Sequence, residues 1–273
     1  MIEVRYRMRF GNNLFQYCFG RILAEELGYE LAADPLPGFP NTSHHVSGNR
    51  YLKPTVRLTG HVTDLSEILS DRSKRHIILD GYFQRYEHYR NYKSRIRNDW
   101  LITNLSSYPI NTKDVVLCVR RGDYVPLHAL PFSYYHDAIR LLHPRRVYIC
   151  SDEPHDPFVK LLVWRYRAEL IPPDPMQNLE FIKSFRKIVI SNSTFCWWAA
   201  FLSHGTEIIA PIPVQGFWGP NYKNSLRVYD EPRYRYIQCK EVYHPNVLER
   251  AIWSYRNLKA YARDTIIQRQ ANL

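Results

Sequence analysis

Two adjacent arginines at the end of an apolar run are the strongest chemical signal in this chain. The run Asp114–Leu117 is typical of a buried strand, and Arg120, Arg121, Gly122 and Asp123 follow it closely. Arginine presents a planar fork of donors that matches two phosphate oxygens at once. The carboxyl ends of strands in an open α/β sheet are also where ligands bind. The pattern indicates an anion site in which Asp123 braces one guanidinium while the other meets the ligand, although a surface Arg–Asp pair is the alternative.

Two further polar groups follow predicted strands of the same half. Asn192, Ser193 and Thr194 lie between a strand at 188–190 and a helix that begins at Phe195. Small hydroxyl residues over the free N–H groups of a helix start form a good phosphate cradle. Asp152 follows the predicted strand 145–150, where it can face the ligand, cap the next helix, or do both.

The first hundred residues contain a second set of candidates. A strand within 1–8, a turn at 11–13 and helical spacing from Leu14 to a stop at Gly28 predict a strand–turn–helix unit, with Asn12 in the turn. The free N–H groups of a helix beginning near residue 13 suit an anion or a sugar hydroxyl. Tyr82 and Gln84 follow a predicted strand at 76–79, where an aromatic face and an amide can bind a sugar, whereas Phe83 is expected in the core.

Three segments in this order resemble the α-1,2-fucosyltransferase family, whose members are inverting enzymes that use GDP-fucose. They are Arg9–Tyr17, Arg120–Tyr124 and Ser191–Ala200, and Gly81–Gln84 is also similar. The resemblance runs from about residue 8 to about residue 202, and its Trp197-Trp198 pair is the most specific part. It implies transfer of L-fucose to a hydroxyl of a glycan, with O2 of galactose as the expected position.

The resemblance also implies roles for individual residues. Arg120 and Asp123 are the expected catalytic residues, and Tyr82 and Gln84 the acceptor contacts. The expected donor contacts are Asn12, Arg120, Arg121, Asp152, Asn178, Asn192, Ser193 and Thr194. The chain departs from the family at Cys118, where histidine is usual, and at Asn178, where aspartate is usual for a guanine contact. No motif identifies a general base.

Alternating strands and helices predict an α/β fold with Rossmann-like units. The family resemblance implies two such domains that face a cleft, the GT-B type. A cluster of Ser, Pro and Asn at 104–111 marks the expected boundary. The prediction is an acceptor-side domain at 1–110, a donor domain at 111–243 and a C-terminal helix at 244–273. Trp197 and Trp198 are expected to pack in the core.

Composition and charge limit the kinds of partner that the protein can bind. The formal net charge is +11 over 273 residues, which favours anionic partners. The basic residues are spread along the chain, which argues against nucleic acid as the partner. The chain contains no Asp-x-Asp sequence of the kind that holds a metal in many nucleotide-sugar enzymes. Arg120 is the natural substitute for the metal, so we expect neither a metal nor a cofactor, with GDP-fucose and a glycan as partners.

Cysteine usage and hydropathy bear on location. The five cysteines include no Cys-x-x-Cys pair, and Cys118, Cys150 and Cys196 lie in apolar contexts typical of buried thiols. No signal peptide or membrane-length apolar run is recognisable. A cytoplasmic protein is the expectation, with the lumenal catalytic part of a longer anchored protein as the alternative.

Three other functions remain open at this level. One is transfer of a different sugar from a different nucleotide. The second is a catalytically silent protein that binds a sugar nucleotide or a glycan. The third is nucleic-acid binding, which rests on charge alone.

Overall fold

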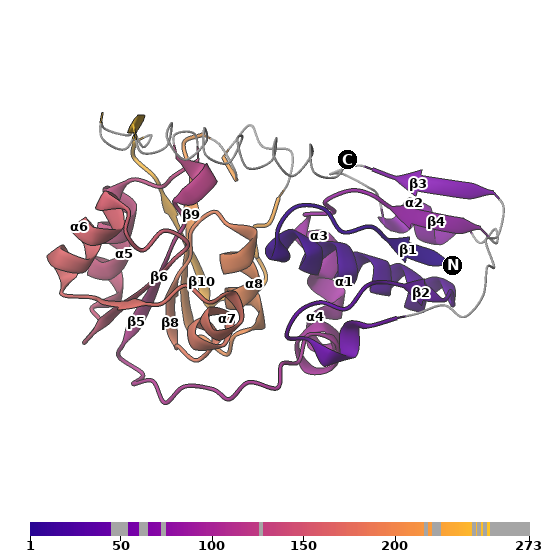
Figure 1. The fold of residues 1–273 in the computed structure, drawn as a ribbon, viewed down its shortest axis with the longest axis horizontal. Helices are drawn as coiled ribbons and strands as arrows, with labels where there is room; N and C mark the ends of the chain where they lie inside the picture. Colours follow the sequence, from indigo (N-terminus) through magenta and orange to yellow (C-terminus); the bar gives the residue numbers. More distant parts are fainter. Residues whose placement is uncertain are drawn as a thin grey trace, which may run out of the picture.

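A computed structural model shows an α/β protein with two parallel sheets (Figure 1). The structure describes residues 1–44, 54–59, 65–71, 75–125, 128–215, 218–219 and 225–241, and the single positions 244, 247, 250 and 251. The strands of the first sheet lie between residues 2 and 79, and those of the second between 115 and 238. The predicted α/β class with parallel sheets is confirmed, whereas the two boundaries between the three predicted segments stay predictions. Most of the expected helix at 244–273 lies outside the described residues.

The first sheet has the strand order β2-β1-β4-β3, with every neighbouring pair parallel. Its elements are β1 (Ile2–Val4), α1 (Phe10–Leu27), β2 (Leu31–Ala32), β3 (Thr55–Leu58), α2 (Leu65–Ser70) and β4 (His76–Leu79). Helix α1 ends at Gly28, whose φ of 66° is the left-handed conformation that glycine tolerates, as predicted. The expected turn at 11–13 is wrong, because α1 begins at Phe10 and these residues form its first turn.

The second sheet has the order β10-β9-β8-β5-β6-β7, again all parallel, which places the arginine strand β5 near its centre. Its strands are β5 (Val115–Val119), β6 (Val147–Ser151), β7 (Glu169–Ile171), β8 (Lys187–Val189), β9 (Glu207–Ile212) and β10 (Tyr234–Gln238). Its helices are α5 (Phe132–Leu142), α6 (Pro157–Tyr166), α7 (Pro175–Lys183) and α8 (Thr194–Leu202). Cys118 pairs with Cys150 across β5 and β6, so the residues after both strands reach one edge of the sheet.

Short helical segments and an extended stretch connect the two sheets. The segments are α3 (Tyr86–Tyr89), a 3-10 turn (Arg90–Tyr92), α4 (Lys93–Arg95) and a π-helical turn (Ile96–Trp100). Residues 101–114 then run from this helical region to β5 without helix or strand (Figure 1). The cluster at 104–111 lies in that connection.

Aromatic packing between α1 and α8 joins the two halves. The Phe15 ring lies 5.0 Å from Trp197 and 4.7 Å from Trp198, measured between ring centroids, and Tyr89 lies 5.8 Å from Trp198. Trp197 and Trp198 are almost fully buried, so their predicted core role is confirmed. One continuous hydrophobic core therefore includes residues from both sheets. Aromatic pairs of this geometry stabilise beyond the area that they bury.

A polar network joins the same halves at the surface. Asp230 accepts hydrogen bonds from the Tyr86 hydroxyl, from Arg90 Nε at 2.9 Å and from Lys93 Nζ at 3.1 Å. Burial alone would raise the pKa of Asp230, but the bonds from Tyr86, Lys93 and Arg90 hold it at about 2. The ionised carboxylate therefore ties helix α3 and the segment after it to the chain just before β10.

We expect Asp230→Asn to lower stability at pH 7 by about 1 kcal/mol, because a partly exposed charged network contributes modestly. The folded pKa of about 2 lies below the ordinary value for an aspartate. The contribution is thus complete above pH 4 and is lost as the pH falls through about 2. Thermal unfolding at several pH values measures this contribution, and the variant should lose less stability than the wild type between pH 4 and pH 2.

Asp137→Asn is the control, because Asp137 pairs with Lys240, whose side chain is 75% exposed, and such a pair contributes little to stability. A variant as stable as the wild type at pH 7 would contradict the assignment.

Candidate functional site

A cavity of about 590 Å³ is lined by residues from both halves of the chain. It contains every predicted site residue except Arg121: Asn12, Tyr82, Gln84, Arg120, Asp123, Asp152, Asn178, Asn192, Ser193 and Thr194. The carboxyl edge of the second sheet supplies most of them, as expected for parallel strands. The start of α1 and the segment after β4 supply the remainder. Sequence reasoning thus brought together residues that the fold does assemble, although their individual roles stay predictions.

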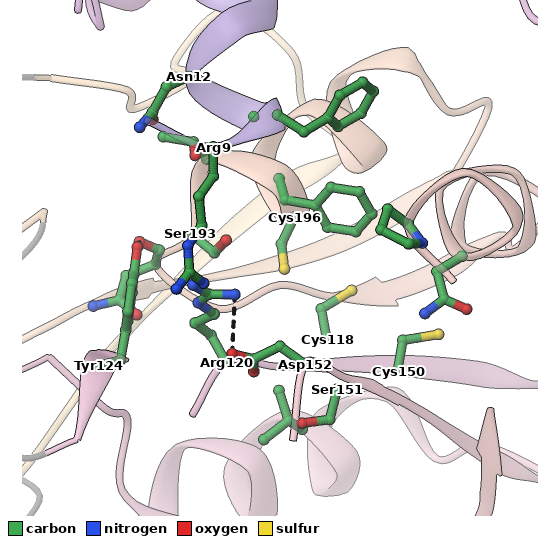
Figure 2. Close-up of a pocket in the computed structure, with 18 of the residues that line it drawn as sticks. Arg9, Asn12, Cys118, Arg120, Tyr124, Cys150, Ser151, Asp152, Ser193 and Cys196 are labelled. Atoms are coloured by element: carbon green, nitrogen blue, oxygen red, sulfur yellow. Dashed lines mark hydrogen bonds and ion pairs between the residues drawn. The ribbon is translucent and has the colours of Figure 1, made fainter. Parts of the chain in front are cut away.

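Arg120 is the central charge of this cavity (Figure 2). Its Nη1 lies 2.9 Å from Asp152 Oδ2 and its Nη2 lies 2.6 Å from Asp123 Oδ1. Burial alone would lower the pKa of Arg120, but Asp152 and Asp123 raise it. The side chain is only 15% exposed, and it packs against the Tyr124 ring at 5.1 Å. The guanidinium is therefore permanently charged and held in a defined orientation.

Arg121 does not line the cavity, which corrects the expected direct donor contact. Its side chain is 1% exposed, its Nε lies 3.1 Å from Asp156 Oδ1, and its guanidinium lies 4.6 Å from the Phe158 ring centroid. The backbone N–H of Arg121 donates to Asp152 Oδ1 at 2.8 Å. The buried Arg121 side chain therefore anchors the turn after β5 in the protein interior. Asp152 links this turn to the Arg120 guanidinium. The cap of helix α6 is Asp156, so the alternative role of Asp152 as a helix cap is wrong.

Arg9 is a site residue that the sequence analysis did not single out. Figure 2 shows its side chain reaching from the start of α1 toward Arg120. Arg9 Nη1 lies 3.5 Å from Asp123 Oδ1, the oxygen that also accepts from Arg120. One carboxylate oxygen thus lies between two guanidinium groups from different halves. Two sequence signals could have identified Arg9: it begins the resembling segment Arg9–Tyr17, and it directly precedes the first helix.

Two helix amino termini meet at the cavity. A Cβ added to Gly11 would lie 2.6 Å from Phe195 N and 2.6 Å from Thr194 Oγ1, so the first turns of α1 and α8 touch. Neither helix has a side-chain cap or an acidic residue in its first turn. No side chain therefore neutralises the positive dipole end of either helix, although the Asn12 N–H donates to the Arg9 carbonyl at 2.8 Å. Arg9 and Arg120 lie beside these helix ends, and Asp123, Asp152 and Asp174 line the same cavity. The two guanidinium groups and the two helix ends are therefore the groups that a phosphate could contact.

Amides line the rest of the wall. Asn12 Oδ1 accepts from Gln84 Nε2 at 2.9 Å, which joins the start of α1 to the segment after β4. Asn192 Nδ2 donates to the His128 carbonyl at 2.9 Å. Asn178, on α7, is buried, and its Oδ1 has no hydrogen-bond partner. A buried acceptor without a partner is costly, so Asn178 Oδ1 is available for a donor on a ligand.

Three thiols form the floor of the cavity. Cys118, Cys150 and Cys196 all line it and are free, as predicted (Figure 2). The hydrogen bond that Cys118 makes with Cys196 raises the pKa of Cys118, and burial adds to this effect. The lining also includes the aromatic residues Tyr124 and Trp218, which the sequence analysis did not assign. The hydrogen bond between Cys118 and Cys196 lowers the pKa of Cys196. The floor thus consists of small sulfur-containing side chains, in contrast to the arginines and aspartates elsewhere in the lining.

Metal-binding and membrane features are absent from the described part of the chain. No group of three or more His, Cys, Asp and Glu residues there could hold a metal ion. None of the described helices is long and apolar enough to cross a membrane.

Comparison with known proteins gives only distant similarities. No family model and no curated protein matches the sequence. Among solved structures, E. coli heptosyltransferase WaaC with ADP has 10% identity and a TM-score of 0.49, covering 94% of this chain and 98% of its own. The NodZ α-1,6-fucosyltransferase soaked with GDP-fucose has 12% identity and a TM-score of 0.47, covering 76% and 93%. The E. coli ADP-heptose heptosyltransferase II has 13% identity and a TM-score of 0.37, covering 60% of this chain and only 55% of its own. With TM-scores below 0.5, these similarities do not define what this chain binds or transfers.

We expect Gly11→Ala to weaken anion binding, because the added methyl group would push apart the starts of α1 and α8. Overpacking of this kind costs about 1–3 kcal/mol of stability, and loss of a charge-assisted bond weakens affinity about tenfold. Titration with inorganic pyrophosphate measures that affinity. Gly20→Ala is the matched control on the same helix, because its methyl group would meet Val4 and Leu79 side chains away from the cavity. It should lower the melting temperature and leave pyrophosphate binding unchanged. Equal affinities for Gly11→Ala and the wild type would contradict the two-helix anion site.

Proposed function

We propose that this protein is an inverting glycosyltransferase of the GT-B type that transfers L-fucose from GDP-fucose to a glycan hydroxyl, in the first instance O2 of galactose. The reaction uses neither a metal nor a cofactor. The nucleotide sugar binds at the carboxyl edge of the second sheet, and the glycan acceptor binds along the wall formed by the first half of the chain. The sequence motifs support the choice of fucose and guanine.

The convergence of Arg120, Arg9 and two uncapped helix starts on one cavity is the observation that carries this proposal. A diphosphate has several anionic oxygens, so it suits a site with several separate sources of positive charge. The cavity volume of about 590 Å³ is within the range of small-molecule sites. A floor of small sulfur-containing side chains beside this charge suits the uncharged parts of a nucleotide sugar.

Arg120 stabilises the leaving group in this reaction. As the bond between the sugar carbon and the β-phosphate oxygen breaks, negative charge grows on the phosphate, and a preoriented guanidinium stabilises it. The side chain of Asp123 is 48% exposed and that of Asp152 is 22% exposed. An incoming phosphate therefore replaces Asp123 on Arg120 more readily than Asp152, which continues to hold the guanidinium. Each charge-assisted hydrogen bond contributes about 1.5–3 kcal/mol to binding.

When the donor phosphate displaces Asp123 from Arg120, the Asp123 carboxylate can take a second role. Of the other carboxylates in the cavity, Asp174 caps α7 by accepting from Gln177 N at 2.9 Å, and Asp152 accepts from Arg121 N. Asp123 is then the group available to take the proton of the acceptor hydroxyl as its oxygen bonds to the sugar carbon. Tyr82 and Gln84 orient the acceptor sugar on the opposite wall. Asp123→Asn should lower kcat with little loss of donor affinity.

Turnover of GDP-fucose on galactoside acceptors tests the proposal directly. Arg120→Lys keeps the charge and loses the fork, so we expect about a 100-fold loss of kcat. Arg140→Lys, an exposed arginine on α5, should behave as the wild type. Near-native turnover by Arg120→Lys would show that the phosphate clamp is misassigned. Binding of GDP-fucose without any turnover would instead identify a silent binding protein.

The same assay in excess chelator tests metal independence. Activity should persist, because Arg120, Arg9 and the helix starts supply the positive charge. Loss of activity that magnesium or manganese restores would reject this part of the proposal.

Asn178→Asp tests the guanine contact. A carboxylate accepts from the ring N–H and the exocyclic amine of guanine together, so the variant should bind GDP about tenfold more tightly. Direct titration with GDP and with ADP measures the change, and the gain should be confined to GDP. Michaelis constants for the acceptor should not change, because the acceptor wall lies across the cavity. A gain in affinity shared equally by GDP and ADP, or an effect on the acceptor alone, would show that Asn178 does not contact the guanine base.

A further inference from the structure

A buried carboxylate beside the acceptor wall holds two half-exposed arginines. Asp80 follows β4, and its side chain is 4% exposed. It accepts from Arg7 through both carboxylate oxygens, with Nη2 to Oδ2 at 2.8 Å, and from Arg57 Nη1 at 3.2 Å. The side chains of Arg7 and Arg57 are 55% and 51% exposed. Two guanidinium groups on one carboxylate leave an excess positive charge at the surface. We call Arg7 and Arg57 the arginine pair.

The arginine pair lies beside the part of the cavity that the proposed function assigns to the acceptor. Arg7 directly precedes Met8 and Arg9, which line the cavity. Asp80, which accepts from both arginines, precedes the lining residue Tyr82 by two positions. Arg7, Arg57 and Asp80 adjoin the lining residues and are not themselves part of the lining. Gln16 fixes this arrangement, because it accepts from Arg7 N at 3.0 Å and donates to the Gly81 carbonyl at 2.9 Å.

The fold itself does not need the second arginine. Asp114, at the start of β5, is an equally buried carboxylate, and Arg145 alone satisfies it with two bonds of 3.0 and 3.1 Å. Arg7 already makes the same two-bond pair with Asp80. Arg57 adds a single bond to the described residues, so most of its donors can face a ligand. A half-exposed guanidinium with open donors matches a carboxylate or a phosphate.

We propose that the acceptor carries an anionic group on its sugar, a carboxylate or a phosphate, and that Arg7 and Arg57 bind this group beside Tyr82. The inference rests on the proposed function in taking this wall as the acceptor side. It narrows the substrate class from glycans in general to acidic glycans. Tyr82 and Gln84 then bind the sugar ring while the arginine pair selects its charge.

Binding of three matched sugars tests the inference without requiring turnover. Methyl β-galactoside, methyl β-galacturonide and methyl β-galactoside 6-phosphate share one ring and differ at C6. Ligand-observed NMR titration of the full chain with GDP present measures their affinities, because GDP occupies the Arg120 region. We expect a charged sugar to bind about fivefold more tightly than the neutral one at low salt, and the difference to fall as salt is added. A preference for the galacturonide identifies a carboxylate, and a preference for the 6-phosphate identifies a phosphate.

Arg57→Gln should abolish this preference and leave the affinity for methyl β-galactoside unchanged. Arg235→Gln is the matched control, because Arg235 is an exposed arginine on β10, the edge strand of the second sheet, as β3 is of the first. It should keep the full preference. Arg57→Lys keeps a charge near Asp80 and loses the planar fork of donors, so it should lower the preference for the charged sugar. It replaces Arg57→Gln as the test variant if Arg57→Gln does not fold.

Equal affinities for the three sugars, or an unchanged preference in both Arg57 variants, would overturn the inference. Failure of GDP-fucose turnover alone would reject the proposed donor and leave the sugar-binding result standing.

Discussion

The close contact between helices α1 and α8 is the constraint on which the rest of the site depends. Gly11 permits it, since any side chain there would meet the backbone of α8 at Phe195. One turn further along, Phe15 packs against Trp197 and Trp198 in a core that continues into both sheets. Because each helix begins at its own sheet's carboxyl edge, this contact brings both edges to one cavity. The apolar packing and the convergence of two positive helix ends are therefore two consequences of a single approach.

Electrostatics in the cavity follow from where the charges are buried. Arg120 remains ionised below the surface because Asp123 and Asp152 compensate it. An unpaired guanidinium at that depth would be expensive, and a fully neutralised one would not attract a ligand. Arg120 is compensated without being closed off from a ligand, because Asp123 is half exposed and is shared with Arg9. An anion that replaces Asp123 gains both arginines, and Asp152 maintains the orientation of Arg120 throughout.

The sequence predicted the positions at strand ends well, because parallel strands place their carboxyl ends at one edge whatever the loops do. It erred where side-chain direction decides. Successive residues of an extended chain point to opposite faces, so of the adjacent pair only Arg120 faces the cavity and Arg121 turns into the structure against Asp156. The start of α1 was placed too late because no side chain caps it. Strand β10 was missed because an edge strand with half-exposed residues lacks the apolar run that marks β5 and β8.

The same contacts that build the cavity also restrict how it can change. The α1–α8 core and the Asp230 network cross between the halves at separate places, so a large opening would have to expose aromatic surface and break the partly exposed ion pairs of Asp230. Such motions are costly relative to the marginal stability of a domain. The cavity is thus largely preformed, which lowers the ordering cost of binding. In the proposed reaction, selectivity for the acceptor comes from groups that are not part of this core. Arg7 and Arg57 meet that condition, because they are held by one buried carboxylate and remain half exposed beside Tyr82.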